Sequence, residues 1–512
     1  MVDVSLPPVI QQMLEPAFYP HAVTTPVRLV QTHTSYVLLT GNYAYKVKKP
    51  VDFGFLDYST LEKRHHFCQE ELRLNQRAAA AIYLEVVAIA QTGTTFTLDP
   101  LENVVEYAVK MRQFPQSALL SQKFAEGELT EDLLKDLAVA IAQFHEIAET
   151  NDYIRGFGTV EQIRQSIDEN YAQTEGFIGG PQTRQQFDET KAYTDHFLAT
   201  QAALLKQRIE QDKIRACHGD LHLNNICYWQ DQLWLFDCIE FNEPFRLVDV
   251  MFDIAYIIMD LTVKGRTDLA ALFLSHYVEQ TGDWEGLQVL PLYVSRQSYV
   301  RAKVTSFLLG DPSIAEAEKQ KAGEQAAQYY TLAWSYIQPQ TGRLFIMSGL
   351  SGSGKSTVAQ ALSRQVGALY VRSDAVRKHL AGVPVAQRGD DSLYTADMNR
   401  KTYDRLIQLG VLLANNGYTV ILDAKFDRVA TRQAAIAQAH SYTLPITIVH
   451  CTAPLETLKQ RVQERQGDIA DATVAVLAQQ ILEPFTEAET SYLVTVDTTQ
   501  PLPSQLATIV GA

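Results

Sequence analysis

The segment that most constrains the fold is a short glycine-rich stretch in the last third of the chain. An apolar run over 343–348 is followed by the pattern G-x-x-x-x-G-K-S, which starts at Gly349 and ends at Ser356. A helical pattern continues to Val366. Glycines allow such a loop to curl so that its backbone N–H groups surround a phosphate. The order of strand, loop and helix therefore predicts a nucleoside triphosphate site and disfavours a chance glycine turn.

Each residue of this loop has an expected role. Lys355 is expected to reach the β/γ-phosphates and so to act in catalysis, and the Ser356 hydroxyl is expected to bind Mg²⁺. The residues of this segment that are expected to bind ATP are Gly349, Ser351, Gly352, Ser353, Gly354, Lys355, Ser356 and Thr357.

A second pattern typical of phosphoryl transfer lies upstream. It reads H-x-D-x-x-x-x-N from His218 to Asn225, and an apolar strand then ends at Asp237. In kinase-like folds the aspartate of this pattern, here Asp220, accepts the proton of the acceptor hydroxyl. Asn225 and Asp237 are the expected Mg²⁺ ligands. A plain turn rich in His, Asp and Asn is the alternative, which the strand ending at Asp237 disfavours.

Length and composition limit the class of protein. A chain of 512 residues with 46% apolar content is long enough for two to four domains with cores of their own. No apolar run approaches the ~18 residues that span a bilayer, and the N-terminus lacks the basic and apolar regions of a signal peptide. The five cysteines form no C-x-x-C pair, so neither a zinc site nor a disulfide framework is expected. We therefore expect a cytoplasmic protein without membrane association.

The net charge of −15 is unevenly distributed along the chain. From residue 341 onward 16 Lys and Arg oppose 15 Asp and Glu, a balance of +1, so the first 340 residues carry 28 against 44, a balance of −16. An acidic N-terminal part makes nucleic acid an unlikely ligand there. The nearly neutral C-terminal part leaves a nucleic-acid ligand open.

The pattern of apolar residues changes along the chain. Strand patterns dominate 29–58 and recur at 104–111, whereas helical spacing prevails from 133 to 337. A helix is expected from about 60 to 80, with a capping box formed by Ser59 and Glu62. A short linker lies between 337 and 342. Strands that alternate with helices follow it and predict a parallel α/β sheet; the expected strands are 343–347, 369–372, 418–422, 446–450 and 492–496.

A lysine and a glutamate are expected to complete the upstream site. The two-residue period of a strand places Lys46 on the same face as Ala44, where it would bind the α/β-phosphates of ATP. Lys48 shares that face and is the alternative. Glu71 interrupts an otherwise apolar stripe of the following helix, and a carboxylate on a buried face needs a cation. We therefore expect Glu71 to pair with Lys46 at the ATP site.

Further charged residues follow the glycine-rich loop. Asp374 is expected to deprotonate an acceptor hydroxyl, and Arg377 to bind an anionic group of the acceptor; a helix N-cap with an exposed arginine is the alternative. Asp423 ends an apolar strand, a position suited to water-mediated binding of Mg²⁺. Arg461 and Arg465 share a helix face and are expected to close over the triphosphate, although a solvated helix is nearly as good an interpretation.

The upstream pattern resembles the aminoglycoside phosphotransferase and choline kinase branch of the kinase-like fold. The resemblance covers roughly 25–335, rests on His218 to Asn225, and implies an α+β bilobal protein-kinase-like domain that phosphorylates a hydroxyl group of a small molecule with ATP. One departure is that no G-x-G-x-x-G precedes Lys46; residues 33–35 occupy its place.

The downstream patterns resemble P-loop kinases of the zeta-toxin, gluconate-kinase and polynucleotide-kinase type. They imply an α/β P-loop NTPase domain with a parallel sheet over 341–512. The whole chain resembles bacterial fusions of an aminoglycoside-phosphotransferase-like domain with a P-loop kinase domain.

The resemblance implies a bifunctional kinase that uses ATP and Mg²⁺ at two sites and phosphorylates small-molecule hydroxyl acceptors. Two alternatives stay open. The C-terminal domain is a zeta-toxin-like or polynucleotide 5′-kinase, or one ATP-binding domain regulates the other without catalysis.

Overall fold

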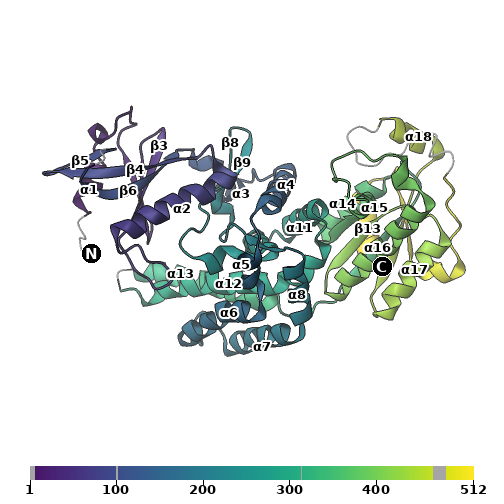
Figure 1. Ribbon diagram of the computed structural model, residues 1–512. Coiled ribbons are helices and arrows are strands. Elements are labelled where there is room, and N and C mark those ends of the chain that lie inside the picture. Colours follow the sequence, from purple (N-terminus) through teal and green to yellow (C-terminus); the bar gives the residue numbers. More distant parts are fainter. Residues whose placement is uncertain (1–5, 100–101, 313, 465–479, 512) are drawn as a thin grey trace. The chain divides into compact units, whose positions relative to one another are not determined.

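The computed structural model describes residues 6–99, 102–312, 314–464 and 480–511 and is shown in Figure 1. The chain forms two compact units. The first unit comprises Met1–Thr130, Phe144–Asp260 and Tyr293–Trp334, and the second comprises Glu131–Gln143, Leu261–Leu292 and Ser335–Ala512. The first has the expected kinase-like fold and the second the expected P-loop fold, whereas the domain boundaries at 25–335 and 341–512 stay a prediction.

In the first unit a short helix, α1 (Pro8–Gln12), precedes a six-stranded antiparallel sheet in the order β1-β2-β3-β6-β4-β5. Its strands are β1 (Arg28–Gln31), β2 (Ser35–Leu39), β3 (Tyr43–Lys48), β4 (Tyr83–Thr92), β5 (Thr95–Leu98) and β6 (Val104–Arg112). In β3 successive side chains point to opposite faces. Tyr45 and Val47 therefore enter a core with Ile10 and Val87, while the two lysines between and after them face the other way.

Helix α2 (Leu61–Ala79) packs against β4 and β6 on the lysine face of the sheet. It begins one residue later than expected, since Thr60 is the N-cap and its Oγ1 accepts a hydrogen bond from the Lys63 backbone N–H at 3.3 Å. The predicted cap at Ser59 is wrong, because the Ser59 hydroxyl donates to Asp57 at 2.6 Å instead. The helix places the Glu71 side chain, 0% exposed, toward β3.

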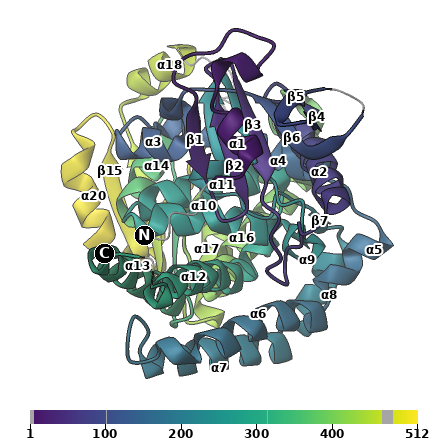
Figure 2. The same ribbon diagram turned by 90° about the vertical axis from the view of Figure 1, so that its left-hand side faces the viewer.

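The chain beyond this sheet is mostly helical up to the linker. Its helices include α3 (Leu120–Ala125), α4 (Glu131–Ile147), α5 (Asp152–Arg155), α6 (Val160–Thr174), α7 (Arg184–Thr200), α8 (Ala202–Glu210), α9 (Glu243–Arg246), α10 (Val250–Val263), α12 (Leu290–Phe307) and α13 (Glu316–Ser335). Two small ladders, β7 (Ile214–Ala216) with β10 (Leu247–Asp249) and β8 (Ile226–Trp229) with β9 (Gln232–Leu235), frame the His218–Asn225 segment. Helices α6 and α7 lie side by side in both Figure 1 and Figure 2.

The second unit is built on a five-stranded parallel sheet in the order β12-β13-β11-β14-β15. Its strands are β11 (Arg343–Ser348), β12 (Leu369–Arg372), β13 (Thr419–Asp423), β14 (Ile446–Thr452) and β15 (Leu493–Asp497). All five strands predicted from the apolar pattern are present to within two residues. The parallel sheet of the sequence analysis is therefore confirmed.

Helices cover both faces of this sheet. On one face α14 (Lys355–Val366) and α20 (Leu502–Gly511) share a core with Phe345, Met347 and Ile421. On the other face α16 (Ala396–Asn415) approaches closely at Gly410, where a Cβ atom would lie 2.8 Å from a methyl carbon of Leu422. A parallel sheet with helices on both faces places a ligand site at the carboxyl ends of the strands.

Helix α11 (Thr267–Thr281) belongs to the second unit and packs against α14 and β12. Arg372, the last residue of β12, donates from Nε to Glu279 of α11 at 2.6 Å. Burial opposes the charge of Arg372, but the contact with Glu279 outweighs it and raises the arginine pKa. This ion pair fixes the end of β12, which leads directly into the segment with Asp374.

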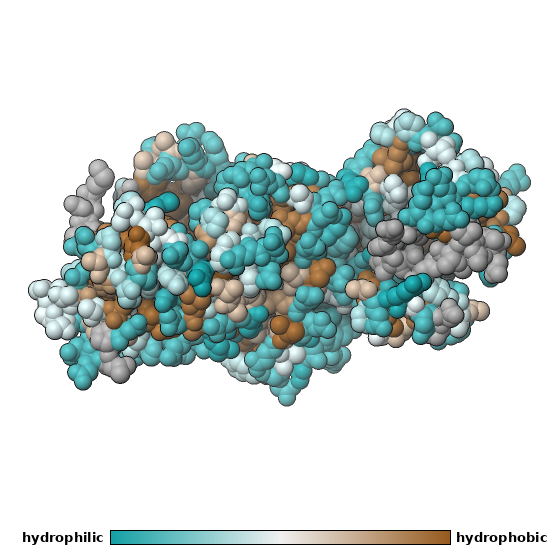
Figure 3. Space-filling model, turned by 90° about the horizontal axis from the view of Figure 1, so that it is seen from above, coloured by the Kyte–Doolittle hydropathy of each residue, from teal (hydrophilic) through white to brown (hydrophobic). Residues whose placement is uncertain are grey.

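Among the described residues, no helix has both the length and the apolarity needed to cross a bilayer. On the face seen in Figure 3, hydrophilic residues predominate and hydrophobic residues are scattered between them. Scattered apolar residues of this kind are normal on a protein surface.

Candidate active sites

The His218–Asn225 segment, which is expected to be catalytic and is called the catalytic segment below, is held by two carboxylates of α10. Asp253 accepts hydrogen bonds from the backbone N–H groups of His218 at 2.9 Å and Gly219 at 2.8 Å. Asp260 accepts from the backbone N–H of Leu223 at 3.0 Å. These carboxylates carry no sequence motif, although their spacing of seven residues places them on one face of the helix. They fix the backbone on both sides of Asp220.

Asp220 lies at the surface of this segment, with its side chain 34% exposed. The Asn225 side-chain N–H₂ donates to its Oδ2 at 3.2 Å and to its backbone carbonyl at 3.0 Å. The His222 Nε2 atom lies 3.3 Å from the same carboxylate. Burial raises the pKa of Asp220, but His222 and Arg301 outweigh burial and lower the pKa to about 2. The carboxylate is therefore ionised at neutral pH and able to accept a proton.

Lys46 joins two residues that are far apart in the sequence. Its Nζ lies 2.8 Å from Glu71 Oε1 and 2.6 Å from Asp237 Oδ1. Burial raises the pKa of Glu71, but Lys46 and Lys48 lower it to about 2. The expected pair of Lys46 with Glu71 is present, and Lys46 also reaches Asp237, which follows β9.

Lys48, the alternative lysine, takes part in the same network. Its Nζ lies 2.7 Å from Glu71 Oε2, so the two carboxylate oxygens of Glu71 bind one lysine each. Lys48 also pairs with Glu240, which accepts a hydrogen bond from the Tyr58 hydroxyl. Lys48 is 1% exposed and Lys46 is 15% exposed at the side chain. The more exposed Lys46 is therefore the better placed of the two to meet a phosphate.

Glu240 and Tyr58 were not predicted from the sequence. Glu240 lies three residues after Asp237, so a D-x-x-E pattern was the available signal. Asp237 itself has a left-handed backbone with φ of 64°, a conformation that few residues other than glycine adopt. Its side chain is 46% exposed, which leaves it accessible to a cation.

The turn before Lys46 is built from side-chain hydrogen bonds. Between β1 and β2, the Thr32 Oγ1 atom accepts from the backbone N–H of Ser35 at 2.9 Å and of Thr34 at 3.3 Å. These bonds occupy backbone donors that a glycine-rich loop would offer to phosphate. Binding of ATP in the first unit would therefore depend on Lys46 and the metal ligands more than on this turn.

The glycine-rich loop of the second unit has the backbone that its pattern requires. It follows β11, and α14 starts at Lys355 with Gly354 as the N-cap. Gly349, Gly352 and Gly354 have φ of 142°, 80° and 82°. A Cβ at Gly349 would lie 2.4 Å from the Cys451 carbonyl oxygen, and one at Gly352 would lie 2.6 Å from that of Leu458. Only glycine fits these positions, which supports a phosphate cradle.

The loop side chains are occupied by neighbouring protein groups. Lys355 Nζ donates to the Leu350 carbonyl at 2.8 Å. The Ser351 backbone N–H donates to Gln480 Oε1 at 2.9 Å, and the Gln480 amide donates back to Ser351 Oγ at 2.9 Å. Ser353 is buried and Thr357 is exposed on the first turn of α14. Phosphate oxygens would accept the hydrogen bonds that Lys355 Nζ and the Ser351 backbone N–H now donate to protein groups.

Arg461 lies against the loop from α18 (Leu455–Glu464). Its guanidinium donates to Thr498 Oγ1 at 2.8 Å and to the Thr498 carbonyl at 3.0 Å, and a longer bond of 3.4 Å reaches the Gly352 carbonyl. It is thus not a free side chain on a solvated helix. Arg465, its predicted companion, lies outside the described residues.

A tyrosine connects the two expected metal ligands of the second unit. The Tyr370 hydroxyl donates to Asp423 Oδ2 at 2.5 Å, and it also hydrogen-bonds the Ser356 hydroxyl. Burial raises the pKa of Tyr370 well above its usual value, and the adjacent Asp423 raises it further. Serine and aspartate oxygens suit Mg²⁺, so these residues fit the expected ion. Sequence reasoning missed Tyr370, whose only signal was its place on β12.

We expect Tyr370→Phe to lower the free energy of unfolding of the nucleotide-free protein by about 1–3 kcal/mol. The change leaves the Asp423 carboxylate, which is 7% exposed, without the hydroxyl that satisfies it. Urea titration followed by circular dichroism measures the effect. Tyr442→Phe, at an exposed tyrosine, is the matched control. Equal stability of the Tyr370 variant and the parent would contradict the role of this hydrogen bond.

The predicted acceptor residues lie on α15 (Ser373–Leu380). Asp374 is in its first turn, and the N-cap position is Arg372, whose side chain makes no cap bond. The capping alternative for Asp374 is therefore not realised. Arg377 is 6% exposed, and among the described residues its Nε and one terminal nitrogen have no hydrogen-bond partner. Its guanidinium lies 4.8 Å from the Tyr394 ring centroid. It is a buried cation rather than the exposed arginine of the alternative.

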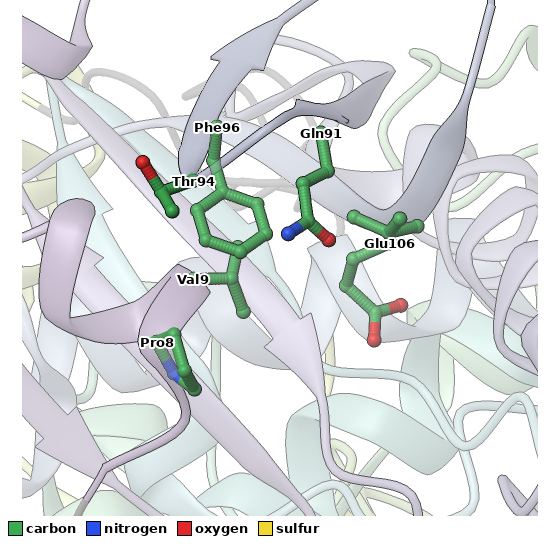
Figure 4. Close-up of a pocket in the computed structure, with 7 residues that line it drawn as sticks. Pro8, Val9, Gln91, Thr94, Phe96 and Glu106 are labelled. Carbon is green, nitrogen blue, oxygen red and sulfur yellow. The ribbon is translucent and has the colours of Figure 1, made fainter.

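A cavity of about 460 Å³ lies in the first unit. Figure 4 shows Gln91 and Glu106 beside Phe96 and Val9. The Glu106 carboxylate is bound by Arg64 Nε at 2.9 Å. The residues described as lining it include none of the predicted site residues, so its size does not make it a candidate active site.

Two segments of the chain match known families. Residues 51–290 match the phosphotransferase enzyme family, and residues 344–483 match the AAA domain family. Three curated relatives are each 30% identical over 454 residues, which is 88% of this chain and 88% of the relative. They are uncharacterized proteins of Mycobacterium bovis (Mb2027c) and of two strains of Mycobacterium tuberculosis (MT2060 and Rv2004c).

Solved structures align with each part. A choline/ethanolamine kinase family protein from Mesorhizobium loti covers 65% of this chain and 99% of its own, with 11% identity and a TM-score of 0.39. The APS kinase CysC of Mycobacterium tuberculosis, in complex with AMPPNP and APS, covers 34% of this chain and 98% of its own, with 22% identity and a TM-score of 0.27.

Proposed function

This chain belongs to the family of its mycobacterial relatives and is a kinase that joins an aminoglycoside-phosphotransferase-like domain to a P-loop kinase domain, and we propose that it is bifunctional. Each domain binds its own MgATP and phosphorylates a hydroxyl group of a small molecule. The observation that carries the proposal for the N-terminal domain is the contact of Lys46 with both Glu71 and Asp237. In this proposal the contact joins the lysine that binds phosphate, the helix carboxylate that holds the lysine and a ligand of Mg²⁺.

In the N-terminal domain, Lys46 binds the α/β-phosphates and Glu71 holds the lysine in place. Asn225 and Asp237 hold Mg²⁺; the Asn225 amide nitrogen is turned to Asp220, which leaves its carbonyl oxygen for the ion. Asp220 accepts the proton of the acceptor hydroxyl as that oxygen bonds to the γ-phosphorus of ATP, and the bond from this phosphorus to the bridging oxygen breaks to release ADP. Bound Mg²⁺ neutralises charge on the phosphates in either domain.

In the C-terminal domain, the glycine-rich loop and Lys355 bind the phosphates, and Ser356 and Asp423 hold Mg²⁺. Asp374 accepts the proton of the acceptor hydroxyl. Arg377 binds an anionic group of that acceptor, which its burial without a carboxylate partner among the described residues supports. Arg461 and Arg465 close over the triphosphate; for Arg461 this means release from Thr498.

We expect the wild-type chain to bind two molecules of ATP in the presence of Mg²⁺, and Lys355→Ala to bind one. The remaining binding depends on Mg²⁺, and Asp237→Ala added to Lys355→Ala removes that dependence because a metal ligand is lost. Isothermal titration calorimetry counts the sites. Lys401→Ala, at an exposed lysine of α16, is the control and binds two.

The same titration separates the alternatives. If Lys355→Ala alone eliminates all ATP binding, the N-terminal domain is a scaffold or a regulator, an outcome that the glycine-free turn at Thr32 favours. A polynucleotide kinase is distinguished by its acceptor. Transfer of phosphate to a 5′-hydroxyl oligonucleotide, with no transfer to any member of a metabolite library, would replace the small-molecule acceptor in the C-terminal domain.

A further inference from the structure

Arg296 is a buried cation without a carboxylate partner in the first unit. It lies on α12 and is 8% exposed. Its only side-chain hydrogen bond within the described residues runs to Gln297 Oε1 at 3.1 Å, and its Nε has none. Burial lowers the pKa of Arg296. An unpaired buried charge costs free energy, so a buried arginine normally pairs with an anion.

Most of the other buried arginines pair with a carboxylate, and Arg296 pairs with none that the structure describes. The arginines classed as buried among the described residues are Arg64, Arg208, Arg246, Arg296, Arg377 and Arg432. Four of them form ion pairs with carboxylates: Arg64 with Glu106, Arg208 with Asp249, Arg246 with Glu243 and Arg432 with Glu489. The two exceptions are Arg377, already placed at the C-terminal acceptor site, and Arg296.

Arg296 lines a cavity of about 40 Å³ between α6, α10 and α12. A cavity needs only about 10–15 Å³ of such space for one water molecule, so this one has room for a small polar group. Asp249 is the other charged residue described in its lining, and both of its oxygens are bound by Arg208, at 2.6 and 2.8 Å. Ser166 and Gln162 of α6 add polar atoms to the wall. The cavity therefore carries an uncompensated positive charge.

A second cation lies on the same helix, outside the described lining of the cavity. Lys303 lies two turns further along α12, on the same face as Arg296. Its Nζ donates to the amide oxygens of Asn170 at 2.7 Å and Gln173 at 2.8 Å, and it forms no ion pair with a described carboxylate. Burial lowers the pKa of Lys303, and Arg296 lowers it further. Glu169 of α6 opposes this lowering, so Arg296 is the more weakly compensated of the two cations.

The cavity lies close to the catalytic segment. The Arg296 guanidinium stacks over the Phe252 ring at 4.6 Å, and the Phe252 ring contacts Tyr256 at 6.1 Å between centroids. Tyr256 lies between Asp253 and Asp260 on the face of α10 that binds the catalytic segment on both sides of Asp220. Burial raises the pKa of Tyr256, and Asp220 raises it further. Two aromatic rings therefore separate Arg296 from the proposed base.

We propose that this cavity is a subsite in which Arg296 binds a small anion that carries a carboxylate or a phosphate group. The subsite goes beyond the proposed kinase activity of the N-terminal domain, because the rings of Phe252 and Tyr256 separate it from Asp220. Arginine suits this task because its planar fork matches both anions.

Thermal unfolding of the full chain with small anions tests the subsite. Lys355→Ala with Arg377→Met is the parent, because the glycine-rich loop and Arg377 are two further anion sites. Inorganic phosphate and sodium acetate are added separately, with chloride keeping the ionic strength constant. We expect phosphate, acetate or both to raise the unfolding temperature by about 2–4 °C for each tenfold increase above saturation. The anion with the larger effect identifies phosphate or carboxylate as the bound group.

Arg296→Met added to the parent is expected to abolish this response, and Arg296→Lys to keep part of it. Without anions the methionine variant should unfold at the same temperature as the parent or higher, since an unpaired buried charge is gone. Ser166→Leu fills the cavity while retaining Arg296 and should also abolish the response. Arg184→Met, at an arginine of α7 with 67% of its side chain exposed, is the control and should respond as the parent does.

Two outcomes overturn the subsite. One is an equal anion response in the parent and in Arg296→Met, and the other is no response of the parent to either anion. If Mg²⁺-dependent ATP binding persists in either case, the proposed kinase site stands without the subsite. If the Arg296-dependent response is present but the Lys355→Ala chain binds no ATP, the subsite stands and the kinase role of the N-terminal domain fails.

Discussion

Asp220→Asn is expected to slow phosphoryl transfer by the N-terminal domain by about 10²–10⁴-fold, the usual cost of losing a general base. Asparagine keeps the shape of the side chain but cannot take the proton of the acceptor hydroxyl. ATP affinity should hardly change, because Lys46, Asn225 and Asp237 stay in place. The rate is measured as acceptor-dependent ATP consumption in the Lys355→Ala chain, with the acceptor found by a metabolite screen.

A matched control is available at Asp231, an exposed aspartate in the turn between β8 and β9. Asp231→Asn makes the same chemical change and should leave the rate unaltered. Because the pKa of Asp220 is lowered to about 2, protonation of this residue should not slow the wild-type enzyme between about pH 8 and pH 5. Full activity of Asp220→Asn would mean that the base lies elsewhere or that this domain does not transfer phosphate.

Asp374→Asn is expected to have an effect of the same size in the C-terminal domain, about 10²–10⁴-fold on turnover. Here the parent is the Asp237→Ala chain, so that only the C-terminal site turns over. ATP binding should persist, because the glycine-rich loop and Lys355 are unchanged. Coupled measurement of ADP release at saturating acceptor gives the rate.

Asp404→Asn, at an exposed aspartate of α16, is the control for this second change. Arg377→Met distinguishes base chemistry from acceptor binding, since loss of the guanidinium should raise the KM for the acceptor more than it lowers kcat. Wild-type turnover in Asp374→Asn would restrict this residue to a structural role in the first turn of α15.

The local signals of the sequence determined the architecture of the C-terminal domain. All five parallel strands follow from apolar runs, because a strand buried on both faces must be apolar throughout. The glycine-rich loop was equally predictable, since Gly349 and Gly352 occupy backbone positions where a side chain would collide with carbonyl groups. Strand periodicity also placed Lys46 on the face that meets Glu71.

Only the tertiary structure decided which side chains meet. Lys48 pairs with Glu71 and Glu240. Asp253 accepts a hydrogen bond from the backbone N–H of His218, and the Tyr370 hydroxyl donates one to Asp423. None of these pairs has a local pattern, because the partners are brought together by packing of elements that are distant in the sequence. Arg296 is a further residue whose surroundings the sequence did not predict. An arginine in a helical pattern suggests a solvated side chain. Only the fold shows that Arg296 is buried beside a cavity and that no carboxylate among the described residues neutralises it.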